Sequence, residues 1–196
     1  LTAVREIMQR LPDENIVYFG DTGRVPYGAR SKETIIKYTR QDIRFLQQFD
    51  CKTLVIACGT ASSVALDTVC DDYGIPIIGV VKATVHRACC ATRNGKIGVI
   101  GTHATIQSGS YVRLIAEENA ALTTFAAACP LFVPLVENGR IAPEDAILKL
   151  AVAEYLAPLR DAGVDTLILG CTHYPIIAQA IGAFMGDGVT LINPGY

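Results

Sequence analysis

Two cysteines occupy matching positions in this chain. Residues 166–175 have the sequence Thr-Leu-Ile-Leu-Gly-Cys-Thr-His-Tyr-Pro, and residues 53–60 have the sequence Thr-Leu-Val-Ile-Ala-Cys-Gly-Thr. In each segment an apolar, strand-like run ends at a cysteine, Cys58 or Cys171, and a helix is expected to follow. Ligands of open parallel sheets bind just beyond the carboxyl ends of the strands. The repeated pattern therefore predicts one site with a thiol on either side of it.

Reactive thiols are favoured at such positions because helix N-termini and exposed backbone amides lower the pKa of a cysteine. His173 lies two residues after Cys171 and could hold a proton near neutral pH or bind a substrate carboxylate. A histidine that is only hydrogen-bonded at a helix start would give the same pattern. The other cysteines are interpreted as small buried hydrophobic residues: Cys51, Cys70, Cys89, Cys90 and Cys129.

Three more segments carry polar groups that could line a site. Residues 18–28, Tyr-Phe-Gly-Asp-Thr-Gly-Arg-Val-Pro-Tyr-Gly, predict a tight loop after a strand, although all these residue types also suit an ordinary turn. Residues 101–105, Gly-Thr-His-Ala-Thr, could cradle a carboxylate with amides and hydroxyls, or simply cap a helix. Glu137 is a loop carboxylate that could bind an ammonium group if it faces the site.

Other chemistries are less well supported by these residues. A Cys/His hydrolase would leave the second cysteine without a task. A zinc site would have Cys58, Cys171 and His173 as ligands, without a recognisable finger or deaminase spacing. The chain contains no Gly-x-Gly-x-x-Gly and no Gly-x-x-x-x-Gly-Lys-[Ser/Thr] segment, so nucleotide binding has no motif support. Nothing in the sequence calls for pyridoxal phosphate or a metal, and no cofactor is expected.

Composition narrows the class of protein. The chain has 196 residues, of which 51% are hydrophobic and 18% are charged, and this length allows one domain or two small ones. A formal charge of −2 gives no basic footprint for nucleic acid, and no block of charge suggests a membrane patch. The longest apolar stretch, residues 120–136, contains two prolines and is shorter than the ~20 residues of a spanning helix.

Seven cysteines without a Cys-x-x-Cys pair favour reduced thiols in a cytosolic protein, and no signal peptide is visible. The first residue is Leu, and residues 2–8 already have a helical pattern. We therefore expect that a further element precedes this sequence.

Short apolar runs alternate with helical stretches, which predicts an α/β fold with a mostly parallel sheet covered on both faces. The predicted strands are residues 16–19, 54–57, 75–81, 97–100, 131–133, 167–169 and 189–192. Ser31 is expected to cap one helix, and Pro143-Glu144-Asp145 to start another. The two matched cysteine segments suggest two similar lobes, residues 1–82 with 192–196 and residues 83–191. The chain would cross between them at residues 80–84 and return at 193–195.

Four segments resemble the glutamate racemase family and follow its order along the chain: residues 18–28, Ala57-Cys58-Gly59-Thr60-Ala61-Ser62, residues 134–137 and Gly170-Cys171-Thr172-His173-Tyr174-Pro175. The resemblance covers nearly the whole chain. It implies two similar α/β lobes, each a mostly parallel sheet flanked by helices, with the active site in the cleft between them. It also implies interconversion of L- and D-glutamate without a cofactor, in the bacterial cytoplasm, to supply D-glutamate for peptidoglycan.

The resemblance assigns roles residue by residue. Cys58 and Cys171 are implied to be the two acid/base thiols, and Glu137 and His173 the polar helpers beside them. The implied substrate contacts are Tyr27, Gly28, Gly59, Thr60, Thr172 and His173, and Thr105 is implied to reach the substrate carboxylate. The expected partner is therefore a small molecule, glutamate, and the resemblance allows a homodimer.

Two residues depart from the usual family pattern: Gly59 stands where Asn is common, and Gly23 where Ala is common. The family also begins with a strand ending in Asp-Ser, which is expected to precede Leu1. Aspartate and hydantoin racemases share the paired thiols and stay open as alternatives. So does a protein on the same fold that binds an amino acid or a partner without catalysis, because Gly59 removes a side chain from the site.

Overall fold

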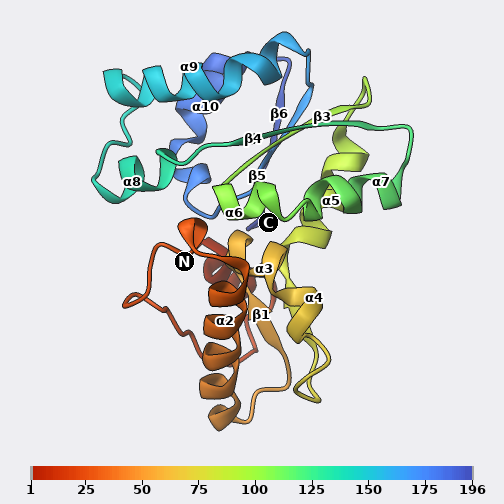
Figure 1. Ribbon diagram of the computed structural model, residues 1–196, viewed down its shortest axis with the longest axis vertical. Helices are drawn as coiled ribbons and strands as arrows, with labels where there is room; N and C mark the ends of the chain where they lie inside the picture. Colours follow the sequence, from red (N-terminus) through yellow and green to blue (C-terminus); the bar gives the residue numbers. More distant parts are fainter. Residues whose placement is uncertain (1, 196) are drawn as a thin grey trace.

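The computed structural model describes residues 2–195, and its strands form two separate parallel sheets (Figure 1). The smaller sheet pairs β1 (Leu54–Ile56) with β2 (Ile77–Gly79), with Leu54 opposite Ile77. The elements before and between these strands are α1 (Thr2–Arg10), η1 (Tyr27–Ala29), α2 (Lys32–Leu46), η2 (Gln47–Phe49), α3 (Gly59–Val64) and α4 (Leu66–Val69).

The larger sheet has the strand order β4-β3-β5-β6, and every neighbouring pair is parallel. Its strands are β3 (Lys96–Gly101), β4 (Thr123–Ala128), β5 (Thr166–Leu169) and β6 (Thr190–Ile192). The helices that follow β2 are α5 (Val80–Ala91), α6 (His103–Gln107), α7 (Ser110–Glu118), α8 (Phe132–Glu137), α9 (Ala146–Asp161), η3 (Tyr174–Ile177) and α10 (Ala178–Met185).

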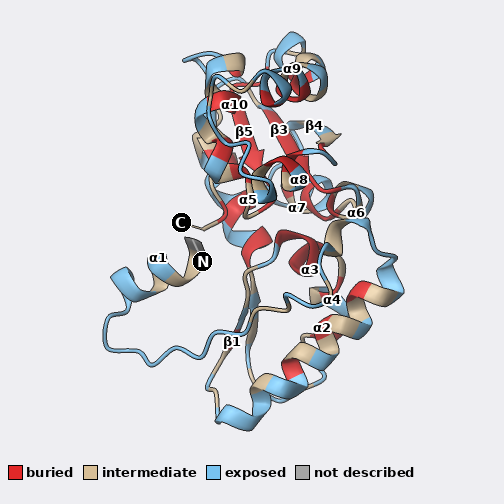
Figure 2. Cartoon of the chain, turned by 90° about the vertical axis from the view of Figure 1, so that its left-hand side faces the viewer, coloured by how far each residue is buried: buried red, intermediate tan, exposed pale blue. Residues whose placement is uncertain are grey.

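Helices cover both faces of the larger sheet, which explains the continuous apolar run of β5. Successive strand residues point to opposite faces. Leu167 and Leu169 therefore pack into the core formed with α9 and α10, whereas Ile168 packs into the core formed with α5 and α7. The fold class predicted from the sequence is confirmed. Buried residues concentrate in this larger sheet (Figure 2), while the smaller sheet has a modest core around Ile43, Leu54 and Val69.

The two sheets differ in size, and α5 leads from the end of β2 to the larger sheet, where it packs against α7 and β5. Residues 80–84, the expected crossover, form the first turns of this helix. Ile192, which the expected division assigns to the first lobe, pairs with Ile168 in the larger sheet. The division into lobes at residues 82 and 192 stays a prediction.

Two predicted strands are wrong. Residues 16–19 form no strand, and their side chains are exposed because no neighbouring strand pairs with them. The ring of Phe19 instead packs on Phe45 of α2, at 4.9 Å between ring centroids. Residues 131–133 lie at the start of α8, and the strand of this region is β4, which pairs along the whole of β3. Three of the six residues of β4 are alanines, which are depleted in strands, so pairing with β3 decides the conformation of this half.

The helix starts were predicted with mixed success. Ser31 caps α2 as expected, because its side chain accepts a hydrogen bond from the Thr34 amide. The predicted start of α9 at Pro143 is wrong, since the helix begins at Ala146. Its N-cap is Asp145, whose carboxylate accepts hydrogen bonds from the amides of Ile147 and Leu148 at 2.9 and 3.0 Å.

Candidate active site

The turns that carry Cys58 and Cys171 touch each other, although they follow strands of different sheets. A Cβ atom added to Gly59 would lie 2.3 Å from the carbonyl oxygen of Gly170 and 3.6 Å from the Cα of Cys171. The residue after the first cysteine is thus in backbone contact with the residues around the second. The structure brings together the two turns whose thiols the sequence analysis paired.

Cys58 is the N-cap of α3 and is exposed to solvent. The amides of Thr60 and Ala61 and the Thr60 hydroxyl lie where they stabilise a thiolate, which lowers the pKa of Cys58. Desolvation by the surrounding protein atoms has a larger effect and raises the pKa of Cys58. The negative charge of Asp42 makes a smaller contribution in the same direction. An exposed but partly desolvated thiol is suited to contact a ligand.

Cys171 follows β5 and is 8% exposed. Burial raises the pKa of its thiol to about 12, and the charges of Cys58 and Glu137 raise it further, while the His173 backbone amide acts in the opposite direction. The electrostatic coupling of Cys171 with Cys58 agrees with the contact between their turns. Each thiol therefore holds its proton tightly in the free protein.

A chain of polar groups leads away from Cys171. Its sulfur lies 3.7 Å from Nδ1 of His173, and Nε2 of the same imidazole lies 3.4 Å from a carboxylate oxygen of Glu137. Glu137 is the last residue of α8, so a residue distant in sequence joins the Cys171 turn. Thr172, between the cysteine and the histidine, is half-buried. This arrangement can orient the imidazole beside the Cys171 thiol.

Three threonine hydroxyls form a buried cluster near Cys58. Thr60 Oγ1 lies 3.0 Å from Thr102 Oγ1, which lies 2.9 Å from Thr105 Oγ1, and the Thr105 hydroxyl also reaches Thr60 at 3.3 Å. Thr102 caps α6 by accepting from the Thr105 amide. Hydroxyls that satisfy one another can turn towards an incoming carboxylate, so the cluster is suited to bind one.

The loop with Tyr27 and Gly28 reaches this cluster and is held by charged side chains. A Cβ on Gly28 would lie 2.6 Å from the Thr102 side chain. The Tyr27 hydroxyl donates to Asp21 and lies 3.0 Å from Asp42 Oδ2, and Arg24 pairs with both carboxylates. Desolvation and these carboxylates raise the pKa of Tyr27, so it stays protonated. The loop is thereby fixed against α2.

The sequence analysis missed two residues near the site. Asp42 of α2 is a half-buried carboxylate, and its place on the helix beside the buried Ile43 was an available signal. Tyr111 is 2% exposed, and its hydroxyl has no hydrogen-bond partner among the described residues. Burial raises the pKa of Tyr111, and the charges of both thiols contribute, which indicates that it lies beneath the site. An unpaired buried hydroxyl has no sequence signal.

The model of the Asp/Glu/Hydantoin racemase family matches residues 2–195. The chain belongs to this family. Among its relatives, the glutamate racemase of Geobacter metallireducens is 45% identical over 193 residues, which cover 98% of this chain and 71% of that protein.

Solved racemase structures resemble the chain closely. Glutamate racemase RacE1 of Bacillus anthracis has a TM-score of 0.94 and 40% identity, over 99% of this chain and 72% of that one. The Francisella tularensis glutamate racemase, solved in complex with D-glutamate, has a TM-score of 0.91 and 40% identity, over 99% and 71%.

The remaining cysteines of this racemase-family chain correct one prediction. Of the five that were interpreted as buried, only Cys129 is buried; Cys51, Cys70 and Cys89 are partly exposed, and Cys90 is exposed. The interpretation is wrong for Cys90 because its side of α5 lies next to the exposed His86, outside the core.

Among residues 2–195, no helix is long and apolar enough to cross a membrane.

Proposed function

We propose that this chain is a cofactor-independent glutamate racemase that uses Cys58 and Cys171 as its two acid/base groups. The observation that carries the proposal is the contact between the two thiol-bearing turns at Gly59 and Gly170. The identity to glutamate racemases supports glutamate as the substrate. Residues 18–28 and 171–175 favour glutamate over the aspartate and hydantoin substrates of other members.

Inversion of the α-carbon needs a proton acceptor on one face and a proton donor on the other. In one direction the thiolate of one cysteine removes the α-proton, and the bond electrons stay on the α-carbon as a carbanion. The opposite thiol then donates its proton to the other face and becomes the thiolate. The reverse direction exchanges the two roles. General acid–base transfer of this kind typically contributes 10²- to 10⁴-fold.

Because the pKa values of both thiols are raised, the site must also help one of them lose its proton. A thiol can act as a base only after it loses its proton, and both cysteines resist this loss. The amides of Thr60 and Ala61 at the N-terminus of α3 favour the thiolate of Cys58. On the other side, His173, supported by Glu137, can take up a proton near Cys171. These groups would compensate for desolvation when a substrate fills the site.

Binding of the substrate carboxylate stabilises the developing carbanion, because negative charge spreads from the α-carbon onto the carboxylate oxygens. The hydroxyls of Thr60, Thr102 and Thr105 can donate to one carboxylate. The backbone at Gly28 adjoins this cluster, and Thr172 lies beside Cys171. Donors that are already in place cost little reorganisation during the reaction.

Exchange of the α-proton in D2O tests the proposal. With L- or D-glutamate, the chain should incorporate deuterium at the α-carbon as the optical rotation is lost, whereas a binding protein should leave the proton in place. Aspartate, in parallel, tests the other racemase specificity. Cys58→Ala and Cys171→Ala should each abolish full racemisation, while Cys90→Ala, an exposed thiol outside the site, serves as the matched control. Full turnover in either active-site variant would refute the two-thiol assignment.

The proposal extends to the cell. A glutamate racemase would supply D-glutamate for peptidoglycan from the bacterial cytoplasm, as the family resemblance implies. Complementation of a D-glutamate auxotroph by the chain tests this role. The homodimer that the resemblance allows belongs to the same proposal, and sedimentation of the purified chain would reveal it.

A further inference from the structure

The space around the α-carbon of Gly59 is too small for any side chain. The added Cβ would lie 2.3 Å from the Gly170 carbonyl oxygen and 3.2 Å from its carbonyl carbon. Both atoms belong to backbone, which cannot rotate away as a flexible side chain can. Gly23, the other departure from the usual family pattern, is the opposite case, because nothing lies within 4 Å of its added Cβ. The two departures therefore differ in their physical consequence.

The Gly170 carbonyl is held in place from behind. The Gly170 amide donates to the Ile100 carbonyl oxygen at 2.7 Å, which ties the turn to β3. Space on the far side of Gly170 is also filled: a Cβ there would lie 2.6 Å from the Ile100 oxygen and 3.3 Å from Cε2 of the buried Tyr111 ring. A side chain at position 59 would therefore have to displace α3 rather than the Cys171 turn.

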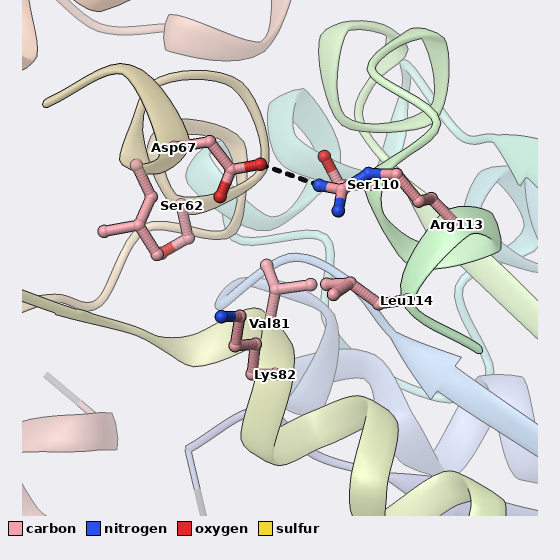
Figure 3. A pocket seen from close by; sticks show the side chains of 8 residues that line it. Ser62, Asp67, Val81, Lys82, Ser110, Arg113 and Leu114 are labelled. Atoms are coloured by element: carbon pink, nitrogen blue, oxygen red, sulfur yellow. Dashed lines mark hydrogen bonds and ion pairs between the residues drawn. The ribbon is translucent and has the colours of Figure 1, made fainter. Parts of the chain in front are cut away.

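Displacement of α3 would strain its contacts with α6 and α7. The Thr60 hydroxyl bonds to Thr102 at 3.0 Å, and the Ser63 carbonyl accepts a hydrogen bond from Ser110. Just beyond α3, Asp67 of α4 pairs with Arg113 of α7 at 2.7 Å across a small hollow (Figure 3). These contacts hold α3 against the larger-sheet side of the protein. The backbone contact between Gly59 and Gly170 limits how closely α3 can approach.

We infer that Gly59 is a positioning residue that sets the separation of the two thiols: its bare α-carbon lets the Cys58 turn seat directly on the peptide before Cys171. This inference rests on the proposed function and adds a role for the departure from Asn. A side chain at position 59 holds the turns further apart. The oxygen contact must lengthen from 2.3 Å to at least the 3.0 Å below which real Cβ atoms are not found, a difference of 0.7 Å.

Proton transfer is sensitive to a shift of this size. A misplacement of about 1 Å can cost roughly 10²-fold in rate. Gly59→Ala and Gly59→Asn should therefore lower kcat by at least about tenfold. KM should rise as well, because the donor Thr60 belongs to α3 and moves with it, whereas Thr102 and Thr105 keep their places. A loss of stability alone would instead lower the amount of folded enzyme and leave kcat per folded molecule unchanged.

The experiment compares Gly59→Ala, Gly59→Asn and the control Gly23→Ala in the full chain, with kcat and KM for glutamate and the folded fraction by circular dichroism. The inference expects Gly23→Ala to match the parent and both position-59 variants to lose kcat. A Gly59→Asn variant as active as the parent, or more active, overturns it, because the site would then accept the side chain. If the parent itself exchanges no α-proton, the proposed function fails instead.

A second measurement reports the separation of the two thiols directly, independently of turnover. Dibromoacetone joins two thiols through a short bridge, and peptide mapping of the parent identifies which thiols are joined. The inference expects a Cys58–Cys171 bridge in the parent, with a lower yield in any folded position-59 variant. Absence of this bridge in the parent overturns the inference, whether or not the chain is a racemase.

Discussion

Removal of the Tyr27 hydroxyl tests how the loop that carries Tyr27 and Gly28 is held. Tyr27→Phe keeps the ring, which packs at 5.8 Å from that of Tyr38, and deletes only the group that lies between Asp21 and Asp42. A phenol has one proton, so at most one full hydrogen bond to a carboxylate is lost. The raised pKa of Asp42, caused first by desolvation, fits a site in which the two carboxylates compete for few donors.

A hydrogen bond to a charged group contributes about 1.5–3 kcal/mol. Tyr27 is half-buried, and Arg24 stays to pair both carboxylates, so we expect a loss of about 2 kcal/mol in the free energy of unfolding. If the loss acts on docking of the loop alone, it corresponds to a roughly 30-fold shift towards the undocked loop. Because Gly28 belongs to this loop, KM for glutamate should rise, by at most that factor, while kcat changes little.

Urea unfolding and steady-state racemisation measure the two quantities. Tyr18→Phe is the matched control, since this tyrosine lies in the same segment and is 60% exposed. A Tyr27→Phe variant with an unfolding free energy within about 0.5 kcal/mol of the parent, the range of ordinary surface substitutions, and with an unchanged KM would refute the reasoning. The network would then be a surface feature without influence on the loop.

Two other predictions concern the groups around Cys171. Glu137→Gln removes the carboxylate that lies 3.4 Å from His173 Nε2 and should lower kcat about tenfold, less than the 10²-fold or more typical of a direct acid–base group; an equal loss in Glu144→Gln, an exposed control, would contradict this. The unfolding free energy should fall above about pH 8.5, where unfolded thiols ionise, because folded Cys171 keeps its proton up to about 12. Urea midpoints across this range test it, and Cys171→Ala should reduce the slope.

The sequence by itself determined the features that depend on neighbouring residues. Apolar runs of strand length predicted β1, β3, β5 and β6, because strands covered on both faces need no polar alternation. Ser31 identified the start of α2, since a cap bonds to an amide only three residues away. The polar residues after the strands predicted the candidate site, because ligands of parallel sheets bind just beyond the carboxyl ends of the strands.

Only the tertiary structure decided which segments pair and touch. Residues 16–19 look like a strand but have no partner, and β4 is a strand because β3 lies beside it. The same holds in the site, where Asp42 meets Tyr27 and the turn at Gly59 meets the Gly170 carbonyl. A chain records the type of each residue but not its distance from residues far along it. That distance follows from how the helices and sheets pack. At position 59 the short distance to the Gly170 carbonyl leaves space only for a glycine.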